Sequence, residues 1–498
     1  MSPSPVRALA LALAVSATLT ASCTVGPKYA RPAPTAPPNG QFVSTTPAIA
    51  AADQPPPNWW KLYNTPELDD LVQEALVHNK NLLQAAANLR YARAALSLAR
   101  AGRYPSTTLS AGAQEGVTAD SLFASRLEGA GTPPATALYS VGLDASYEVD
   151  LFGRIRRTVQ AAKADYEAQK ATEDATRISV AGETTRAYVN ACAYAQELSV
   201  ARQSLDLVTQ NYQVILKQAQ FGAVDDFDVA RARQLVSQTQ ASVPGFEGQR
   251  RTALFELAVL TGRTPEEVSK AADACKAPPT LSNVLPVGDA KALFQRRPDV
   301  RQAERQLAAN VARIGVATAN LYPTISIGGS VGSAAGGAGG LTSASNLSYG
   351  LGPLLNWTFP NTLVAQAQIR QARATASASY ANFEGVVLTA LKDVEEALTS
   401  YGAELDRNGS LVQARDQSQI AYKLARIQYD NGAISYLDVL TAETNLVNAN
   451  AALADSDQAL ASDQVTVFKA LGGGWEQAPA VEPLPITDRR TGKDVKIH

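Results

Sequence analysis

Apolar and polar side chains alternate along four short segments of this chain. Between residues 139 and 149 the odd positions are apolar, and the even positions between them are small or polar. Residues 347–359 repeat this pattern, and shorter versions begin near Leu109 and Ile325. Because successive side chains of a strand point to opposite faces, we expect strands at about 106–118, 137–150, 324–334 and 347–359. An apolar outer face is typical of a transmembrane barrel strand, but a half-buried strand of a soluble sheet alternates equally well.

Two other segments predict single helices of unusual length. No proline occurs between Pro134 and Pro244 or between Pro360 and Pro479. Residues 153–221 and 361–431 each fit one helix of about 70 residues, about 100 Å long at the rise of an α-helix. Alanines recur along both helices, and small side chains let neighbouring helices pack closely, as in extended coiled coils. Each long helix is followed by a second one, so we expect helical hairpins over 153–262 and 361–471.

The chain also repeats itself. Tyr104-Pro105 follows one helical pattern, and Tyr322-Pro323 follows another 218 residues later. Gly222-Ala223 and Gly432-Ala433 lie 210 residues apart in matching surroundings. We therefore expect two structural repeats, at 58–262 and 296–471, each reading helix, two strands and helical hairpin. Residues 263–295 form an insert between the repeats, and residues 472–498 follow the second one.

Four strands are too few to close a barrel in one chain. A membrane barrel needs at least eight strands, and an open edge cannot face lipid. If these strands cross a membrane, the chain must therefore assemble with copies of itself. Two, three or four copies would each close a barrel.

The first 57 residues resemble a secretion signal followed by a membrane-attached tether. Residues 1–22 have the charge, apolar stretch and small residues of a signal peptide. They end at Cys23, as in a bacterial lipoprotein signal, although Thr20 stands where the lipoprotein motif usually has leucine. We expect Cys23 to be lipidated, which would hold the chain at a membrane; the alternative is an ordinary signal peptide with an incidental cysteine. Residues 23–57 then form a lipidated N-terminus and a proline-rich tether.

Composition excludes several functions. Lys and Arg number 44 and Asp and Glu 46, so no basic excess favours nucleic acid. Only His78, His498 and three cysteines could serve as nitrogen or sulfur ligands of a metal, and we expect no metal site and no cofactor. Residues 328–332 match the Gly-x-Ser-x-Gly nucleophile pattern but continue into a glycine-rich loop. We therefore expect no enzyme activity. After the N-terminus no run of about 20 apolar residues occurs, so any membrane crossing must use strands.

Several motifs together resemble the TolC-like outer membrane efflux factors, in the lipoprotein branch that serves resistance-nodulation-division pumps. They are residues 26–32 (GPKYARP), Asn58-Trp59-Trp60 with Pro66-Glu67-Leu68, and Arg296-Arg297-Pro298-Asp299-Val300, beside the repeated Tyr-Pro and Gly-Ala pairs. The resemblance implies a mainly α-helical chain with a transmembrane β-barrel. It implies a homotrimer whose barrel has twelve strands, four from each chain, above a periplasmic helical tunnel. Residues 58–70, 263–295 and 472–498 are the candidates for an equatorial domain around that tunnel.

The same resemblance implies a function. The protein would be a passive exit duct in the bacterial outer membrane, lipid-anchored and extending into the periplasm. Its partners would be a periplasmic adaptor, also called a membrane fusion protein, and an inner-membrane transporter that hands over small molecules. One alternative is the duct of a type I protein secretion system. Another is a periplasmic coiled-coil adaptor without a channel, although an adaptor normally has one helical hairpin and this chain has two.

The turns that join long to short helices are the candidate aperture. In a trimer six such turns would converge on one axis, and rings of carboxylates there would favour cations or bond to arginines that hold a gate shut. The alternative is that Asp225 and Ser435 simply cap helices. The turns are also the natural surface for the adaptor, with Gly222, Ala223, Gly432 and Ala433 as docking candidates. The gate candidates are Asp225, Asp226, Asp228, Arg231, Arg426, Asp430 and Asp438.

Two further groups of residues carry expectations. Tyr147, Trp357 and Phe359 fit an aromatic girdle at a membrane interface, with core packing as the alternative. Cys192 and Cys275 would both lie in an oxidising periplasm. They are a candidate disulfide between the equatorial domain and the tunnel, with two buried free thiols as the alternative.

Overall fold

The computed structural model describes residues 24–34, 40–45, 50–51, 53–117, 119–281, 284–359, 362–481, 486–487 and 494–495. Cys23 and the signal peptide lie outside these residues. The described residues fall into two compact units. Unit 1 contains those within Met1–Pro32, Tyr91–Ala168 and Glu304–Asn382, and unit 2 contains those within Ala33–Arg90, Gln169–Ala303 and Phe383–His498. Each unit therefore takes part of its chain from both sequence repeats.

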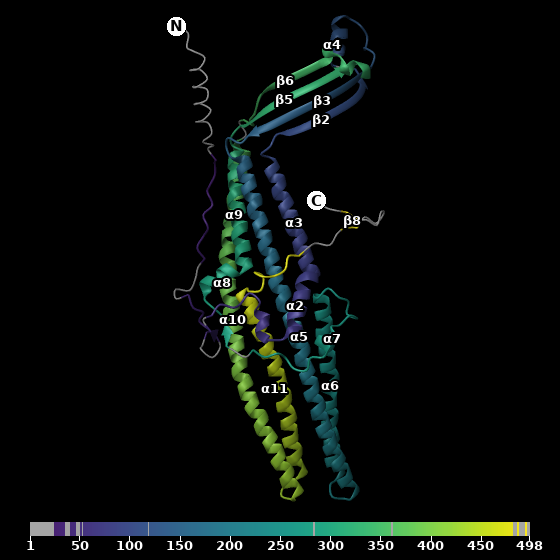
Figure 1. Cartoon of the computed structure of the whole chain (residues 1–498), viewed down its shortest axis with the longest axis vertical. Helices are drawn as coiled ribbons and strands as arrows, with labels where there is room; N and C mark the ends of the chain where they lie inside the picture. Colours follow the sequence, from purple (N-terminus) through teal and green to yellow (C-terminus); the bar gives the residue numbers. More distant parts are fainter. Residues whose placement is uncertain are drawn as a thin grey trace. The chain divides into compact units, whose positions relative to one another are not determined.

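Unit 1 contains a four-stranded antiparallel sheet (Figure 1). Its strands are β2 (Ser106–Gly116), β3 (Thr136–Val149), β5 (Thr324–Ala335) and β6 (Leu347–Asn356), in the order β2-β3-β5-β6. The expected mainly helical chain with four strands is confirmed. The connection from β2 to β3 contains the short helix α4 (Ala119–Leu127), which we did not predict. The connection from β5 to β6 has two 3₁₀ turns, η2 (Ala338–Thr342) and η3 (Ala344–Asn346).

The last strand is shorter than the sequence pattern suggested. We expected it to reach residue 359, but β6 ends at Asn356, so Trp357 and Phe359 follow the strand instead of ending it. Asn356 pairs with Thr324, the first residue of β5. The residue before Thr324 is Pro323, which has no backbone N–H to extend the ladder. The same Tyr-Pro pair that ends the preceding helix therefore also limits the sheet.

Four helical segments complete unit 1. They are the end of α3 (Lys80–Ala101), the start of α5 (Arg154–Gln220), most of α9 (Pro298–Ala319) and the start of α10 (Thr362–Asp430). Ala164, Ala308 and Ala309 are buried together, and Tyr29 packs against them. Phe152 stacks on Tyr322 with ring centroids 4.5 Å apart. These small and aromatic contacts hold the helix ends beside the chain segments that lead into the sheet.

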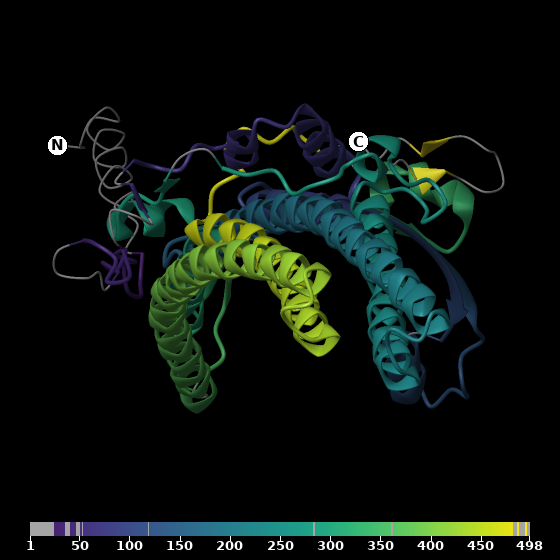
Figure 2. The same ribbon diagram turned by 90° about the horizontal axis from the view of Figure 1, so that it is seen from below.

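Unit 2 is built from two helical hairpins. The long helix α5 is followed by α6 (Asp226–Leu260), and α10 is followed by α11 (Tyr436–Leu471). The helices of unit 2 form an arc, and its shorter segments lie on the convex side (Figure 2). Among the described residues, no helix combines the length and the apolar character that crossing a membrane would require. The helices are held instead by packing against one another and against the shorter segments.

Those shorter segments form the main core of unit 2 with the hairpins. They comprise η1 (Trp59–Tyr63), α2 (Pro66–His78), α7 (Lys270–Asp273), α8 (Ala290–Arg296) and the parallel pair β1 (Ala50–Ala51) with β4 (Leu285–Pro286). The C-terminal pair β7 (Ile486–Thr487) and β8 (Asp494–Val495) is antiparallel. Trp59 and Trp60 are fully buried, and Trp59 stacks on Phe468 of α11 at 4.8 Å. This apolar seam fixes the segment around residues 58–70 to the second hairpin.

The helix that opens each repeat is interrupted at an equivalent place. The first breaks at Asn79, between α2 and α3, and the second breaks at Arg297, between α8 and α9. These positions are 218 residues apart, the same separation as the two Tyr-Pro pairs. The Asn79 side chain accepts from the N–H groups of Asn81 and Leu82, so it caps α3. Arg297, which precedes Pro298, donates to Asp299, Asp393 and the carbonyl of Ala470, and so ties three helices together.

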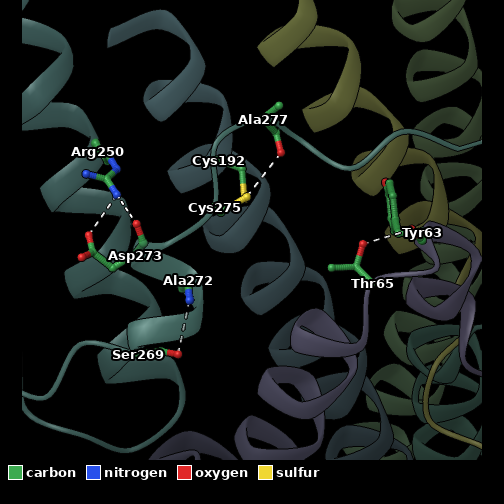
Figure 3. The surroundings of a disulfide bond; sticks show 9 residues. All are labelled: Tyr63, Thr65, Cys192, Arg250, Ser269, Ala272, Asp273, Cys275 and Ala277. Carbon is green, nitrogen blue, oxygen red and sulfur yellow. Dashed lines mark hydrogen bonds and ion pairs between the residues drawn. A yellow bond between two sulfur atoms is a disulfide. The ribbon is translucent and has the colours of Figure 1, made fainter. Parts of the chain in front are cut away.

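The insert between the repeats is joined covalently to α5. Cys192 and Cys275 form a disulfide with 5.1 Å between their Cα atoms (Figure 3). Cys192 is fully buried on α5, and Cys275 follows the short helix α7. Beside it, Arg250 of α6 forms an ion pair with Asp273 at 2.9 Å. The insert is therefore attached to both helices of the first hairpin.

Removing the disulfide should loosen the insert. We expect the Cys192→Ser/Cys275→Ser chain to lose about 2 to 4 kcal/mol of unfolding free energy, because a cross-link that closes a long loop restricts the unfolded chain. Trypsin should then cut faster at the exposed Lys270 and Lys276 of the insert, as followed by mass spectrometry. Treatment of the unsubstituted protein with a reductant should give the same cleavage, and the double variant should not respond to it. Two free thiols in the unreduced mature protein would contradict the bond.

Candidate functional site

The sheet of unit 1 has one apolar and one polar face. Residues directly opposite each other in an antiparallel ladder share a face, so rows can be followed across all four strands. One row is Leu109, Leu143, Val331 and Tyr349, and the next is Thr108, Asp144, Ser330 and Gly350. The four side chains of the first row are between 41% and 86% exposed. A row of large apolar side chains exposed on a sheet marks a surface that is covered in the working protein.

Both edges of this sheet are open. Among the described residues, β2 pairs only with β3, and β6 pairs only with β5. The outer N–H and C=O groups of β2 and β6 therefore have no strand partner in the same chain. Exposed edges pair readily with other strands, so one chain presents an unfinished ladder on both sides.

The Gly-x-Ser-x-Gly segment is part of this sheet. Ser330 lies in the middle of β5, paired with Asp144 on one side and Gly350 on the other. The nucleophile motif requires a sharp turn from a strand into a helix, and Ser330 has an unbroken strand on both sides. Its glycines instead allow close approach of neighbouring strands. Among the described residues, no three His, Cys, Asp or Glu side chains gather as a metal site would require.

Three aromatic residues lie on or just past the strands. Tyr147 is on the apolar face of β3, paired with Ile327. Trp357 and Phe359 follow β6, with ring centroids 4.9 Å apart, and both are exposed. The indole N–H of Trp357 donates to the carbonyl of Leu321 at 3.3 Å. Within one chain these two rings are not part of a buried core, so the girdle at a membrane interface stays a prediction.

The two hairpin turns in unit 2 have the same backbone geometry. Gly222 and Gly432 take φ values of +68° and +72°, in the left-handed region that favours glycine. Ala223 N–H donates to Gln218 C=O at 2.9 Å, and Ala433 N–H donates to Gln428 C=O at 2.8 Å. These are the bonds of a helix end with glycine in the cap. A Cβ added at either glycine would meet no other atom within 4 Å, so both turns project into open space.

Several aspartates of the turns serve as caps. The Asp225 carboxylate accepts from Asp228 N–H at 2.9 Å at the start of α6. The Asp438 carboxylate accepts from the N–H of Ser435 at 3.1 Å and from its hydroxyl at 2.7 Å at the start of α11. Acidic side chains in a first helical turn also interact favourably with the helix dipole. Capping and a role at an aperture are compatible, because each cap uses one carboxylate oxygen, Oδ1 of Asp225 and Oδ2 of Asp438.

The candidate arginines do not pair with these aspartates within the chain. Arg231 lies over the Phe227 ring, 3.9 Å from its centroid. Arg426 donates to the side-chain oxygen of Asn211 at 2.8 Å. Among the described residues, no ion pair reaches the five candidate carboxylates, which are Asp225, Asp226, Asp228, Asp430 and Asp438. The turns of one chain therefore carry uncompensated negative charge.

A buried polar network above the turns was not predicted from the sequence. Asn211 of α5 donates to Glu443 of α11 and to the hydroxyl of Tyr422 of α10, while it accepts from Arg426. Glu443 is 1% exposed, and its burial raises the pKa of its carboxyl to about 7, although Asn211 and Arg426 act in the opposite direction. The network joins side chains of three helices, α5, α10 and α11.

The raised pKa of Glu443 predicts a pH-dependent stability. The folded chain holds the proton up to about pH 7, whereas an unfolded glutamate releases it near pH 4.5, so this site loses stability as pH rises through that window. We expect Glu443→Gln to match the unsubstituted protein near pH 4. Above pH 7 it should be more stable by about 3 kcal/mol, since the pKa rises from 4.5 to about 7 and each pKa unit is worth about 1.4 kcal/mol.

Thermal melts of both proteins from pH 4 to pH 8 measure this difference. Glu256→Gln, at an exposed position on α6, is the matched control and should keep a constant offset from the unsubstituted protein. An offset for Glu443→Gln that does not change with pH would show that burial does not hold the proton there.

Comparison with known proteins agrees with this architecture. A profile of the family described as outer membrane efflux protein matches residues 71–263 and again residues 290–473. Nodulation protein T of Rhizobium leguminosarum bv. viciae is 30% identical over 477 residues, covering 95% of this chain and 95% of that protein. Cation efflux system protein CusC of Escherichia coli O6:H1 is 29% identical over 481 residues, covering 96% of this chain and all of that protein.

Solved structures give the same result. The outer-membrane channel OprN superposes with a TM-score of 0.84 at 32% identity, covering 91% of this chain and all of that chain. A structure of CusC superposes with a TM-score of 0.78 at 27% identity, again covering 91% of this chain. The two matched segments of the family profile coincide with the two sequence repeats, each containing a strand pair and a helical hairpin. The chain belongs to the outer membrane efflux protein family.

Proposed function

We propose that this protein is the outer-membrane channel of a tripartite efflux system. It would be a passive exit duct for small molecules handed over by an inner-membrane transporter through a periplasmic adaptor. The observation that carries this is the sheet of unit 1, whose alternating rows suit lipid on one face and water on the other. The names of two relatives support this proposal. One is cation efflux system protein CusC, and the other, from Pseudomonas putida, is called toluene efflux pump outer membrane protein.

The open sheet edges require partners, and we propose three copies of this chain. β2 of one copy would pair with β6 of the next, so that three four-stranded sheets close into a twelve-stranded barrel. A closed barrel satisfies every backbone group without exposing an edge to lipid. Two copies would give the smallest membrane barrels, which side chains fill. Three copies leave room for a passage, which the proposed function requires.

The N-terminus would anchor each copy by lipid on Cys23. Thr24, the next residue, and the segment that follows it are bonded to the start of α5 in unit 1. Thr24, which would be the second residue of the mature chain, lies in the same unit as the sheet. Acyl chains on Cys23 would therefore enter the membrane that the sheet crosses.

The shorter segments of unit 2 would form the equatorial domain. Side chains of 58–70, 263–295 and 472–481 share one core with Trp59 and Phe468, and the disulfide joins the insert to α5. The turns at the ends of the hairpins would form the aperture, with the unpaired aspartates as a negative rim. Such a rim concentrates cations and repels anions.

Electron microscopy of the detergent-extracted full-length protein tests the channel. We expect a three-fold tube with a detergent belt around its sheets. Intact mass measurement of the same sample should show acyl groups on a chain that begins at Cys23. A rod or compact particle without a belt would overturn the channel, and an unacylated mature chain would overturn the anchor alone.

Substitution at the turns tests adaptor docking. Ala223→Arg and Ala433→Arg add a long cation to two exposed turns that have free space. We expect each to reduce cross-linking to the adaptor and export by the assembled pump at least about tenfold, since a misplaced interface charge costs more than 1.4 kcal/mol. Ala271→Arg, an exposed alanine in α7, is the matched control and should leave both unchanged. Normal export by both turn variants would place the adaptor elsewhere.

A further inference from the structure

The backbone of Val25 and Gly26, just after Cys23, is held against unit 1 by hydrogen bonds and close packing; we call this position the seat. Val25 N–H donates to the carbonyl of Phe152 at 3.2 Å. The guanidinium of Arg157 donates to the carbonyls of Val25 and Gly26 at 3.2 and 3.1 Å. Gly26 has φ +85° and lies so close to α9 that a Cβ would be 2.5 Å from Gly315 Cα. Only glycine allows this approach, so the backbone there lies directly on the helix.

An open groove of about 800 Å³ lies beside this seat. Residues of α5, α9 and the N-terminal segment line it, all of them within unit 1. Its cationic side chains are Lys28, Arg156, Arg157, Lys163 and Arg305, and Glu167 is the acidic side chain in the lining. The alanines of the two helices leave its floor free of large side chains.

Part of this positive charge is already neutralised. Arg305 bonds to Glu304 and, at 3.0 Å, to Glu167. Lys163 lies 3.7 Å from Glu167, but this one carboxylate already accepts from Arg305, so it cannot neutralise both cations and Lys163 keeps charge for a ligand. Asp150 lies close by in sequence, but its carboxylate accepts from the backbone N–H groups of Ile155 and Arg156.

The remaining cations have neutral partners. Arg156 donates to the hydroxyl of Thr24 at 2.9 Å, and Arg157 donates to two carbonyls and to the side chain of Gln160. Among the described residues, Lys28 has no ion pair. Arg157 is 5% exposed, and its burial, with the neighbouring charge of Arg156, lowers its pKa. Residues 1–52 contain no Asp or Glu, so the N-terminal segment cannot supply an anion. A buried cation without an anion is costly, which indicates that a ligand supplies one.

We propose that this groove binds the phosphate group of an anionic membrane lipid. Guanidinium and ammonium groups are the usual partners of phosphate, arginine through paired N–H donors. The location favours a lipid source over free phosphate, because Thr24 lines the groove and is the residue after Cys23. This choice of source rests on the lipid attachment proposed above; the binding of phosphate does not. A bound lipid would place a second membrane contact beside the acyl anchor and fix the depth of each copy.

Native mass spectrometry of the full-length protein in detergent tests the groove, with phosphatidylglycerol as the probe and phosphatidylcholine as the zwitterionic comparison. The test variant is Lys28→Gln/Lys163→Gln, because both lysines are exposed and neither bonds to the seat. We expect its affinity for phosphatidylglycerol to fall about 10- to 30-fold, since each basic side chain at an anionic lipid is worth about tenfold or less. Binding of phosphatidylcholine should be weak in both proteins.

The matched control is Lys80→Gln/Lys217→Gln, which removes two exposed lysines of unit 2 and should keep the affinity of the unsubstituted protein. Equal phosphatidylglycerol affinity in the test variant and the control would overturn the site. Displacement of the lipid by inorganic phosphate at a similar concentration would overturn the lipid source and assign the groove to free phosphate. Lipid binding does not require export, so a protein that binds as expected but forms no tube would overturn the channel and keep the groove.

Discussion

The backbone hydrogen bonds that β2 and β6 leave unmade are the constraint on which the rest of this structure depends. A four-stranded sheet with an exposed row of large apolar side chains is unfavourable as an isolated surface in water, and its open edges cannot face lipid either. Further copies of the chain would pair both edges and close the sheet into a barrel. In a membrane, lipid would then cover the apolar row of that barrel. In the proposed trimer the helices of the three copies would also be arranged around one axis. The duplication of the chain serves this geometry, because each repeat supplies one strand pair and one hairpin.

Much of this architecture could be predicted from the sequence because its patterns are local. Alternation identified the four strands, and the long proline-free stretches identified the two long helices. The places where the prediction differed involve partners that the pattern does not contain. β6 ends at Asn356 because the strand beside it begins after Pro323, and the first helix breaks at Asn79, where no proline marks the break. The Arg297 break, by contrast, directly precedes Pro298 and has a sequence signal.

The candidate site also combines local features, which the sequence reveals, with contacts between distant residues, which it does not. Glycine at the two turns and aspartate beside them are visible in the sequence, and their caps form as local chemistry dictates. The partners of Arg231 and Arg426 are not visible, because an aromatic ring and a buried amide compete with the carboxylates for these side chains. In the buried network Asn211 bonds to Tyr422, Arg426 and Glu443, each of which is more than 200 positions away in the sequence. Such contacts depend on how three helices pack, which no periodicity in one helix encodes.

The distribution of stabilising contacts within unit 2 bears on how an aperture could work. The main core brings together buried tryptophans, the Arg297 cluster and the disulfide, so that the hairpins are held firmly beside the shorter segments. Near the turns the apolar core is small and centred on Ile215, Tyr436 and Val439. A polar network replaces further apolar packing there, and it contains Glu443, whose pKa is raised by burial. Local opening is easiest where few apolar contacts must be broken. The turn ends should therefore change shape at lower free-energy cost than the region of the disulfide. This would suit the proposed aperture, which would open while the proposed equatorial domain stays fixed.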